Sequence, residues 1–267
     1  MDTFVNEKDF ELLSGDRYTF SVLTRILGEK CELIRSDHRR LILCHSEAPW
    51  PVWIWTPDGI TEDEKEQAWK LAEEYRPLSA GNRYNMKYEL ADYFIARCRE
   101  SGMDAGYAMR LFAYDCPVPV APDVLADGSL YRCTQQDLEE ATALFLRFGE
   151  AVGEDIPSPE HALRRTRLLI DNGTLFFWKD AAGQVVACCS YRVIGGNLAS
   201  LGSVYTLPEY RRKHYAQHMV WQVTRMVSDA GYVPMLYTDA DYAASNACYE
   251  KIGYVLRGKL CTLAASV

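Results

Sequence analysis

Three consecutive basic residues precede a long amphipathic segment in the C-terminal half of the chain. Arg211, Arg212 and Lys213 follow a short turn, and apolar side chains then recur at three- and four-residue intervals from Ala216 to Ala230. The first turn of a helix presents backbone N–H groups without intrahelical partners and the positive end of the helix dipole. The junction therefore predicts an anion site, for which a pyrophosphate is the natural occupant. The alternative is a basic helix start that is simply solvated.

A second group of polar residues follows the next expected strand, Pro234–Thr238. Asn246 and Tyr249 are three residues apart in the short helix expected at Ser245–Lys251, which Gly253 closes. Residues at this spacing share one helix face, so the two side chains are expected to point into the same region. A packing role for the tyrosine is the alternative.

The two motifs together resemble the GNAT (Gcn5-related) N-acetyltransferases. The residues that carry the resemblance are V-Y-T-L-P-E-Y-R-R-K-H-Y-A at 204–216 and S-N-A-C-Y-E-K-I-G-Y at 245–254. The resemblance extends over about Ser129 to Leu260, including the order of strands and helices. It implies an acetyl-CoA-dependent N-acetyltransferase that transfers the acetyl group to a primary amine of a small molecule or peptide by direct attack on the thioester.

The resemblance also implies roles for individual residues. Backbone N–H groups near Val204 and Tyr205 would bind the oxyanion, and Tyr249 would protonate the departing CoA thiolate. The cofactor-binding residues implied are Val204, Tyr205, Thr206, Arg211, Arg212, Lys213, His214, Tyr215, Ala216 and Asn246.

One residue departs from the family pattern. His214 occupies a position where the family has glycine, which adopts a positive φ without strain. The imidazole would either crowd the pyrophosphate or, when protonated, bind it. A non-catalytic CoA-binding or interaction protein with a degenerate GNAT fold is therefore the alternative function.

The general base is not assigned by the sequence. An alkyl ammonium must lose its proton before it attacks a thioester, so the reaction needs a base or a proton path. Glu150, Glu154, Asp155 and Glu209 are candidates, and each is also compatible with a solvated surface position.

No metal is expected. His214 and His218 have the four-residue spacing of a helical metal site, but no carboxylate or cysteine nearby completes a ligand set. The nine cysteines contain no C-x-x-C pair, which favours reduced thiols over a zinc or disulfide framework.

Three prolines, at 117, 119 and 122, mark an extended connector in the middle of the chain. We expect a linker at 117–127 between a smaller α/β domain at 1–116 and an acetyltransferase domain at 128–267. The second domain is expected to contain a mixed, mostly antiparallel sheet flanked by helices, so the fold class is α/β (α+β). The first shows no motif of its own; one interpretation makes it a degenerate copy of the same fold.

Composition excludes several classes of protein. The 267 residues are 48% hydrophobic and 25% charged, which is typical of a globular chain and not of a disordered one. A net charge of −8 opposes binding to nucleic acid, whose phosphates require cationic partners. No apolar run reaches the ~18–20 residues that cross a bilayer, and acidic residues stand where a signal peptide has basic ones. We therefore expect a cytoplasmic enzyme with no membrane or nucleic-acid partner.

Overall fold

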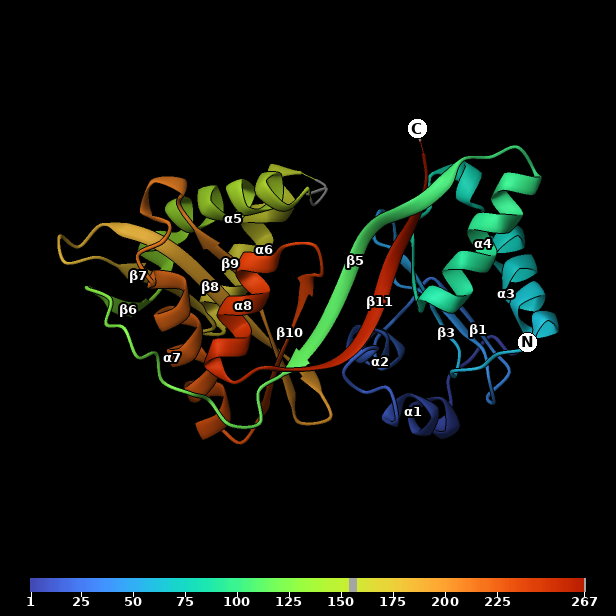
Figure 1. Cartoon of the computed structure of the whole chain (residues 1–267), viewed down its shortest axis with the longest axis horizontal. Helices are drawn as coiled ribbons and strands as arrows, with labels where there is room; N and C mark the ends of the chain where they lie inside the picture. The colour runs from blue at the N-terminus through green and yellow to red at the C-terminus, as the bar shows by residue number, and fades with distance from the viewer. Residues whose placement is uncertain (154–157, 267) are drawn as a thin grey trace. The chain divides into compact units, whose positions relative to one another are not determined.

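The computed structural model describes residues 1–153 and 158–266. The chain forms two compact units (Figure 1). The first comprises Met1–Ala113, Thr238–Asp241 and Leu256–Val267, and the second comprises Tyr114–Tyr237 and Tyr242–Val255. The C-terminal strand therefore belongs to the same unit as the N-terminal half of the chain.

The second unit is built on a sheet in the order β10-β9-β8-β7-β6. Its strands β6 (Ser129–Arg132), β7 (Leu175–Lys179), β8 (Val185–Gly195) and β9 (Leu198–Thr206) pair antiparallel. Short connections predict this for β7, β8 and β9. β10 (Val233–Asp239) pairs with β9 in parallel, across the helix that joins the two strands. The expected mixed, mostly antiparallel sheet is confirmed.

Helices cover both faces of this sheet. Two neighbouring residues of β7 show this, because successive side chains of a strand point to opposite faces. Phe177 packs with residues of α5 (Leu138–Val152) and α6 (Pro159–Asp171) in one apolar cluster. Its neighbour Trp178 instead contacts the ring of Tyr215 in α7 (Tyr215–Asp229), which packs against α8 (Ala243–Ile252). In Figure 1, α7 and α8 lie on the near side of these strands and α5 and α6 on the far side.

Local sequence signals set the ends of these helices. Ser158 caps α6 by accepting a hydrogen bond from the N–H of His161, with Pro159 in the first turn. Thr134 and Asp137 form a reciprocal capping box around the short 3-10 helix η2 (Gln135–Asp137), from which α5 continues. Gly153 and Gly253 end α5 and α8 in the left-handed conformation.

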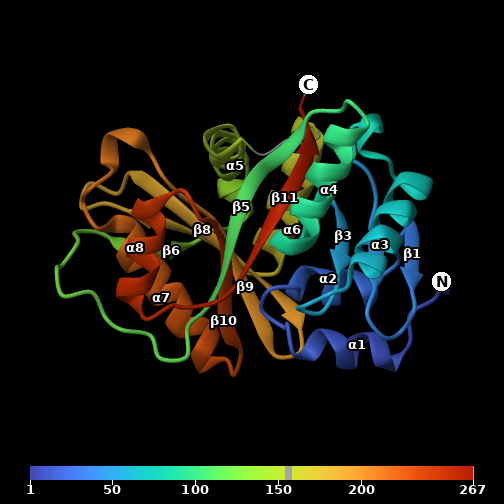
Figure 2. The same cartoon turned by 45° about the vertical axis from the view of Figure 1, so that its right-hand side comes forward.

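The first unit has a sheet in the order β1-β2-β3-β4-β11-β5. Its elements are α1 (Glu7–Ser14), α2 (Ser21–Leu27), β1 (Leu33–Ser36), β2 (Ile42–His45), β3 (Val52–Trp55), α3 (Glu62–Tyr75), η1 (Leu78–Ala80), β4 (Tyr84–Met86), α4 (Tyr88–Glu100), β5 (Ala105–Asp115) and β11 (Val255–Ala265). Trp69 of α3 and Phe94 of α4 pack edge to face in one apolar cluster, and Phe20 contacts Trp53 of β3 outside that cluster. Figure 2 shows α3 and α4 in front of the strands of this unit. The tryptophans at 53 and 55 are buried core residues.

One expectation for this unit needs correction. The helical spacing of apolar residues such as Leu90 and Phe94 predicts a helix from about Met86 to Glu100. The helix α4 instead begins at Tyr88, because Met86 ends β4, where it pairs with Cys261 of β11. The motifs described above do not mark α1 or α2.

The two halves of the chain share one order of elements. From α1 to β5 the order is two helices, three strands, a helix, a strand, a helix and a strand, and α5 to β11 repeats it, if the short 3-10 helices η1 and η3 (Pro208–Tyr210) are set aside. The third and fourth strands of the series pair in parallel in both cases, β3 with β4 and β9 with β10.

Candidate active site

The parallel strands β9 and β10 separate before they end. Their pairing runs from Leu198 opposite Val233 to Leu201 opposite Leu236. In the described part of the chain no register extends beyond that pair, although β9 continues to Thr206 and β10 to Asp239. A split between two strands leaves backbone groups of β9 available to a ligand that lies between them.

A β-bulge lies in the split part of β9. Ser203 and Val204 together oppose the single residue Cys189 of β8, because Gly202 pairs with Ser190 and Tyr205 with Cys188. Ser203 adopts a φ of 51°, in the left-handed region. The hydroxyls of Ser203 and Thr206 are buried without a hydrogen-bond partner among the described residues.

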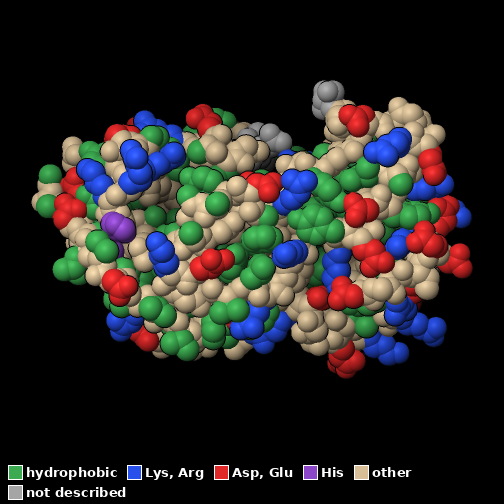
Figure 3. Space-filling model, in the orientation of Figure 1, with side chains coloured by type: hydrophobic (Ala, Val, Ile, Leu, Met, Phe, Trp, Pro, Cys, Tyr) green, Lys and Arg blue, Asp and Glu red, His purple; other side chains and the backbone are tan. Residues whose placement is uncertain are grey.

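The basic loop connects β9 to α7 through the 3-10 helix η3 (Pro208–Tyr210). Arg211 Nε donates a hydrogen bond to the carbonyl oxygen of Thr206 at 3.3 Å, which holds the loop against the end of β9. The side chains of Arg212 and Lys213 are exposed. Lys and Arg side chains gather on the surface near the start of α7 (Figure 3), as the predicted anion site requires.

The start of α7 has no side-chain cap. The first intrahelical bond found there is donated by His218 to the carbonyl of His214. The N–H groups of Tyr215, Ala216 and Gln217 therefore precede the first hydrogen-bonded turn and point out of the N-terminal end of the helix. These amides and the exposed side chains of Arg212 and Lys213 together form a positively charged surface at the start of α7.

His214 takes the conformation for which glycine is favoured. It is the residue before α7 and has a φ of 63°. Its ring is exposed, with Nδ1 3.4 Å from Oε1 of Gln217. Arg212 also has a φ of 63°, so the loop has two left-handed residues without any glycine.

Tyr215 contributes packing through its side chain. It is only 4% exposed and lies beside Trp178. Its hydroxyl donates a hydrogen bond to Asp127, which lowers the pKa of that carboxyl and raises the pKa of Tyr215 to about 12. Its backbone N–H, rather than its side chain, is thus the part of Tyr215 that lies at the start of α7.

Asn246 and Tyr249 lie together on the buried face of α8. Their exposed fractions are 8% and 7%. Burial raises the pKa of the Tyr249 phenol far above its usual range, with further contributions from the nearby Cys248 and Cys189. Ser245 opposes this shift by hydrogen bonding to the phenol oxygen. Tyr249 therefore keeps its own proton at neutral pH.

Two of the four candidate bases lie in the part of the chain that the structure describes. Glu150 is exposed near the end of α5, and Glu209 is exposed in η3. Glu154 and Asp155 lie outside the described residues. Neither Glu150 nor Glu209 is selected as a base by its surroundings.

The ring of His218 is hydrogen bonded to the backbone and does not pair with His214 at a metal site. Its Nε2 donates to the carbonyl oxygen of Val124 at 2.7 Å, and its ring lies beside Trp178. Within residues 1–153 and 158–266 no group of three or more His, Cys, Asp or Glu side chains is arranged to hold a metal ion. The nine cysteines are free thiols.

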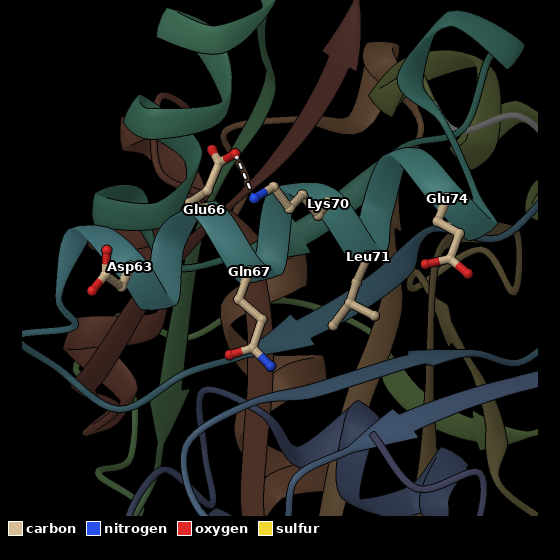
Figure 4. A pocket seen from close by; sticks show the side chains of 6 residues that line it. All are labelled: Asp63, Glu66, Gln67, Lys70, Leu71 and Glu74. Atoms are coloured by element: carbon tan, nitrogen blue, oxygen red, sulfur yellow. Dashed lines mark ion pairs between the residues drawn. The ribbon is translucent and has the colours of Figure 1, made fainter.

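A cavity of about 420 Å³ lies on the outer surface of α3 in the first unit. Its lining residues all belong to that one helix, and in Figure 4 their side chains point in different directions. Lys70 is engaged by Glu66 at 3.3 Å. The side chains do not converge on a ligand, so this cavity is no candidate for the active site.

Comparison with known proteins identifies the family to which the second unit is similar. The sequence profile of the Acetyltransferase (GNAT) family matches residues 135–254. This part of the chain is a GNAT domain. Membership indicates an acyltransferase, and the structure contributes the elements that carry the motifs: β9, the loop before α7, and α8.

Solved structures show a similar fold over the whole chain. A Drosophila protein has a TM-score of 0.69 and 13% identity, with 99% of this chain and 98% of that chain covered. A GCN5-related N-acetyltransferase from Kribbella flavida has a TM-score of 0.64 and 16% identity over 95% and 96%. A GNAT-family acetyltransferase from Colwellia psychrerythraea has a TM-score of 0.59 and 13% identity over 100% and 99%. No curated protein matches the sequence.

Ser203, in the split part of β9, is a residue that the sequence motifs did not indicate. It precedes the quoted motif, and a bulge depends on how β8 and β9 pair, which no local pattern of residue types specifies. The adjacent Gly202 is the only local signal.

Among the described helices, none is long and apolar enough to cross a membrane.

Proposed function

We propose that the chain is an acetyl-CoA-dependent N-acetyltransferase that acts on a primary amine of a small molecule or peptide. The observation that carries the proposal is the split between β9 and β10 beside the uncapped, basic start of α7. An acyl-CoA needs an anion site for its pyrophosphate and an extended channel for its pantetheine arm, and these two features are adjacent in the sequence and in the second unit.

The residues present are compatible with this substrate. The N–H groups of Tyr215 and Ala216 and the side chains of Arg212 and Lys213 would hold the pyrophosphate. His214 is compatible with this arrangement because it takes the left-handed conformation and its ring is exposed. Asn246 of α8 would bind the pantetheine arm.

The chemistry requires two groups besides the acyl-CoA. Attack of a neutral amine on the thioester carbonyl forms the new C–N bond and places negative charge on the carbonyl oxygen. Backbone N–H groups at Val204 and Tyr205 would stabilise that charge. Collapse of the tetrahedral intermediate breaks the C–S bond, and the buried, protonated Tyr249 would donate its proton to the CoA thiolate. The attacking nitrogen loses one proton to water as the amide forms, and Tyr249 takes a proton back from water, so that the net change is transfer of one proton from the amine to the thiolate.

We also propose that the first unit is a degenerate copy of the same fold that does not bind acyl-CoA. Its helix α3 stands where α7 stands in the second unit, after the third strand of the series. However, α3 is capped by Thr61, and its first turn contains Glu62, Asp63 and Glu64. These carboxylates oppose a pyrophosphate, so one acyl-CoA is expected per chain.

Calorimetric titration with acetyl-CoA tests the proposal. We expect a stoichiometry of one, with affinity reduced in Arg212→Ala and Lys213→Ala and unchanged in the control Arg167→Ala, an exposed arginine of α6. Absence of binding at millimolar acetyl-CoA would refute the substrate assignment.

Release of CoA thiol upon addition of amines then tests turnover. Binding of acetyl-CoA without transfer to any of a broad panel of primary amines would favour the non-catalytic alternative. Transfer to alcohols in preference to amines would refute N-acetyl specificity while retaining acyl transfer.

A further inference from the structure

Ser203 combines two unfavourable features in one residue. Its backbone has a φ of 51°, a region that side chains other than glycine seldom occupy. Its side chain is buried, at 5% exposure for the residue, and Oγ has no hydrogen-bond partner among the described residues. Such a combination persists in a fold when the surroundings impose it or when the group has a function.

The neighbouring serine shows that the fold can satisfy a hydroxyl at this depth. Ser190 of β8 is also 5% exposed, and its Oγ donates to the carbonyl oxygen of Gly202 at 3.2 Å. The carbonyl oxygen of Ser203 itself accepts from Cys188 Sγ at 3.5 Å. The carbonyl oxygens of Gly202 and Ser203 therefore accept hydrogen bonds from β8, whereas the Ser203 hydroxyl has no partner among the described residues.

The bulge by itself does not require a serine. Glycine adopts a positive φ without steric cost, and its hydrogen side chain would leave no buried polar atom. Among the non-glycine residues with a positive φ in the described chain, Ser203 alone lies within a strand. The hydroxyl is therefore the feature of Ser203 that the fold leaves unexplained.

The position of Ser203 relates it to the proposed reaction. It lies two residues beyond Leu201, the last residue of β9 that pairs with β10, and directly before the backbone groups at Val204 and Tyr205. We infer that the Ser203 hydroxyl donates a hydrogen bond to the thioester carbonyl oxygen of the bound acyl-CoA, in addition to the backbone donors. This inference rests on the proposed function.

The contact can be tested without knowledge of the acceptor, because free CoA lacks the acyl carbonyl. We would measure the dissociation constants of acetyl-CoA and of CoA for the parent, Ser203→Ala and Ser203→Gly, and the Tm of each protein without ligand. Ser190→Ala is the matched control, since it removes an adjacent buried hydroxyl that already has a partner.

The expected results separate the two serines. In both Ser203 variants, the Kd for acetyl-CoA rises about 2- to 12-fold relative to that for CoA, which corresponds to one net hydrogen bond. The Tm of Ser203→Ala stays near that of the parent, and the Tm of Ser203→Gly does not fall below that of Ser203→Ala. Ser190→Ala has a lower Tm and an unchanged ratio of the two dissociation constants.

Two outcomes would overturn the role of Ser203. One is an unchanged ratio in Ser203→Ala; the other is a change of equal size in Ser190→Ala, which would mean that any loosening of the bulge has this effect. A parent that binds neither CoA nor acetyl-CoA would instead refute the proposed function on which the inference rests.

Discussion

Replacement of Tyr249 by phenylalanine isolates the proton that the proposed reaction needs. The ring lies beside Tyr254 with centroids 5.9 Å apart, and this packing is preserved in the variant. The substitution removes the hydroxyl and, with it, the hydrogen bond from Ser245. The change therefore affects proton donation far more than the shape of α8.

The size of each effect follows from these contacts. Loss of one hydrogen bond costs about 0.5–1.5 kcal/mol, and Ser245 is only half buried, so its hydroxyl can bond to water instead. For a chain of this size the Tm should fall by roughly 2–4 °C per kcal/mol. Loss of a general acid, by contrast, lowers kcat about 10²–10⁴-fold.

The assay compares kcat, the Kd for acetyl-CoA and the Tm of the parent, Tyr249→Phe and Asn246→Ala, once an amine acceptor has been found. Tyr249→Phe should lower kcat with little change in the Kd, because the proton is needed only as the thiolate leaves. Asn246→Ala should raise the Kd, because its contact exists before reaction. Burial raises the pKa of Tyr249, so ionisation of this phenol should not reduce kcat below about pH 10.

The reasoning is refuted if Tyr249→Phe retains the parental kcat while single-turnover kinetics show that C–S bond breaking limits the rate. Tyr249 would then be a packing residue, and the thiolate would take its proton from water or another group. A fall in the Tm of more than about 10 °C would also contradict the assumption that the packing of α8 is preserved.

Three further predictions concern stability and are checked by thermal unfolding. His214→Gly should raise the Tm slightly, because relief of a left-handed backbone (about 1–2 kcal/mol) exceeds the entropy cost of glycine (about 0.4–1 kcal/mol). The control Asn197→Gly, at a φ of 59°, should raise the Tm less, because asparagine tolerates this region, and equal increases in Tm would contradict the reasoning. Gly258→Ala should destabilise the protein by about 1–3 kcal/mol, because the added Cβ would overlap the buried hydroxyl of Thr19. Gly106→Ala is the control and should not lower the Tm, because the Cβ added there meets no atom within 4 Å. Burial lowers the pKa of His45, so the unfolded chain binds its proton first as the pH falls below about 6.5; the Tm of the parent should fall more between pH 7.5 and 5.5 than that of His45→Gln, and parallel losses would show that this histidine is not responsible.

The sequence determined much of the second unit because its signals are local. The stripe from Ala216 to Ala230 and the basic residues before it place the start of α7. Capping residues and glycines likewise place the ends of α5, α6 and α8. The motif residues from Val204 onward were sufficient to indicate the family, since a phosphate-binding loop is encoded by a short continuous segment.

Tertiary structure decided the features that depend on pairing between distant segments. Met86 became a strand residue because Cys261, far along the chain, pairs with it, and a helical pattern around residue 86 contains no information about that partner. The membership of β11 in the first unit is likewise a property of the sheet.

The same reason applies to the site. The sequence indicated that Tyr249 and Asn246 share a helix face, which is a matter of helical periodicity alone. Two features depend on the register of three strands: β9 parts from β10 after Leu201, and a bulge then leaves the Ser203 hydroxyl buried without a partner among the described residues. Register is fixed by the packing of the whole sheet, so it is specified only when the chain is folded.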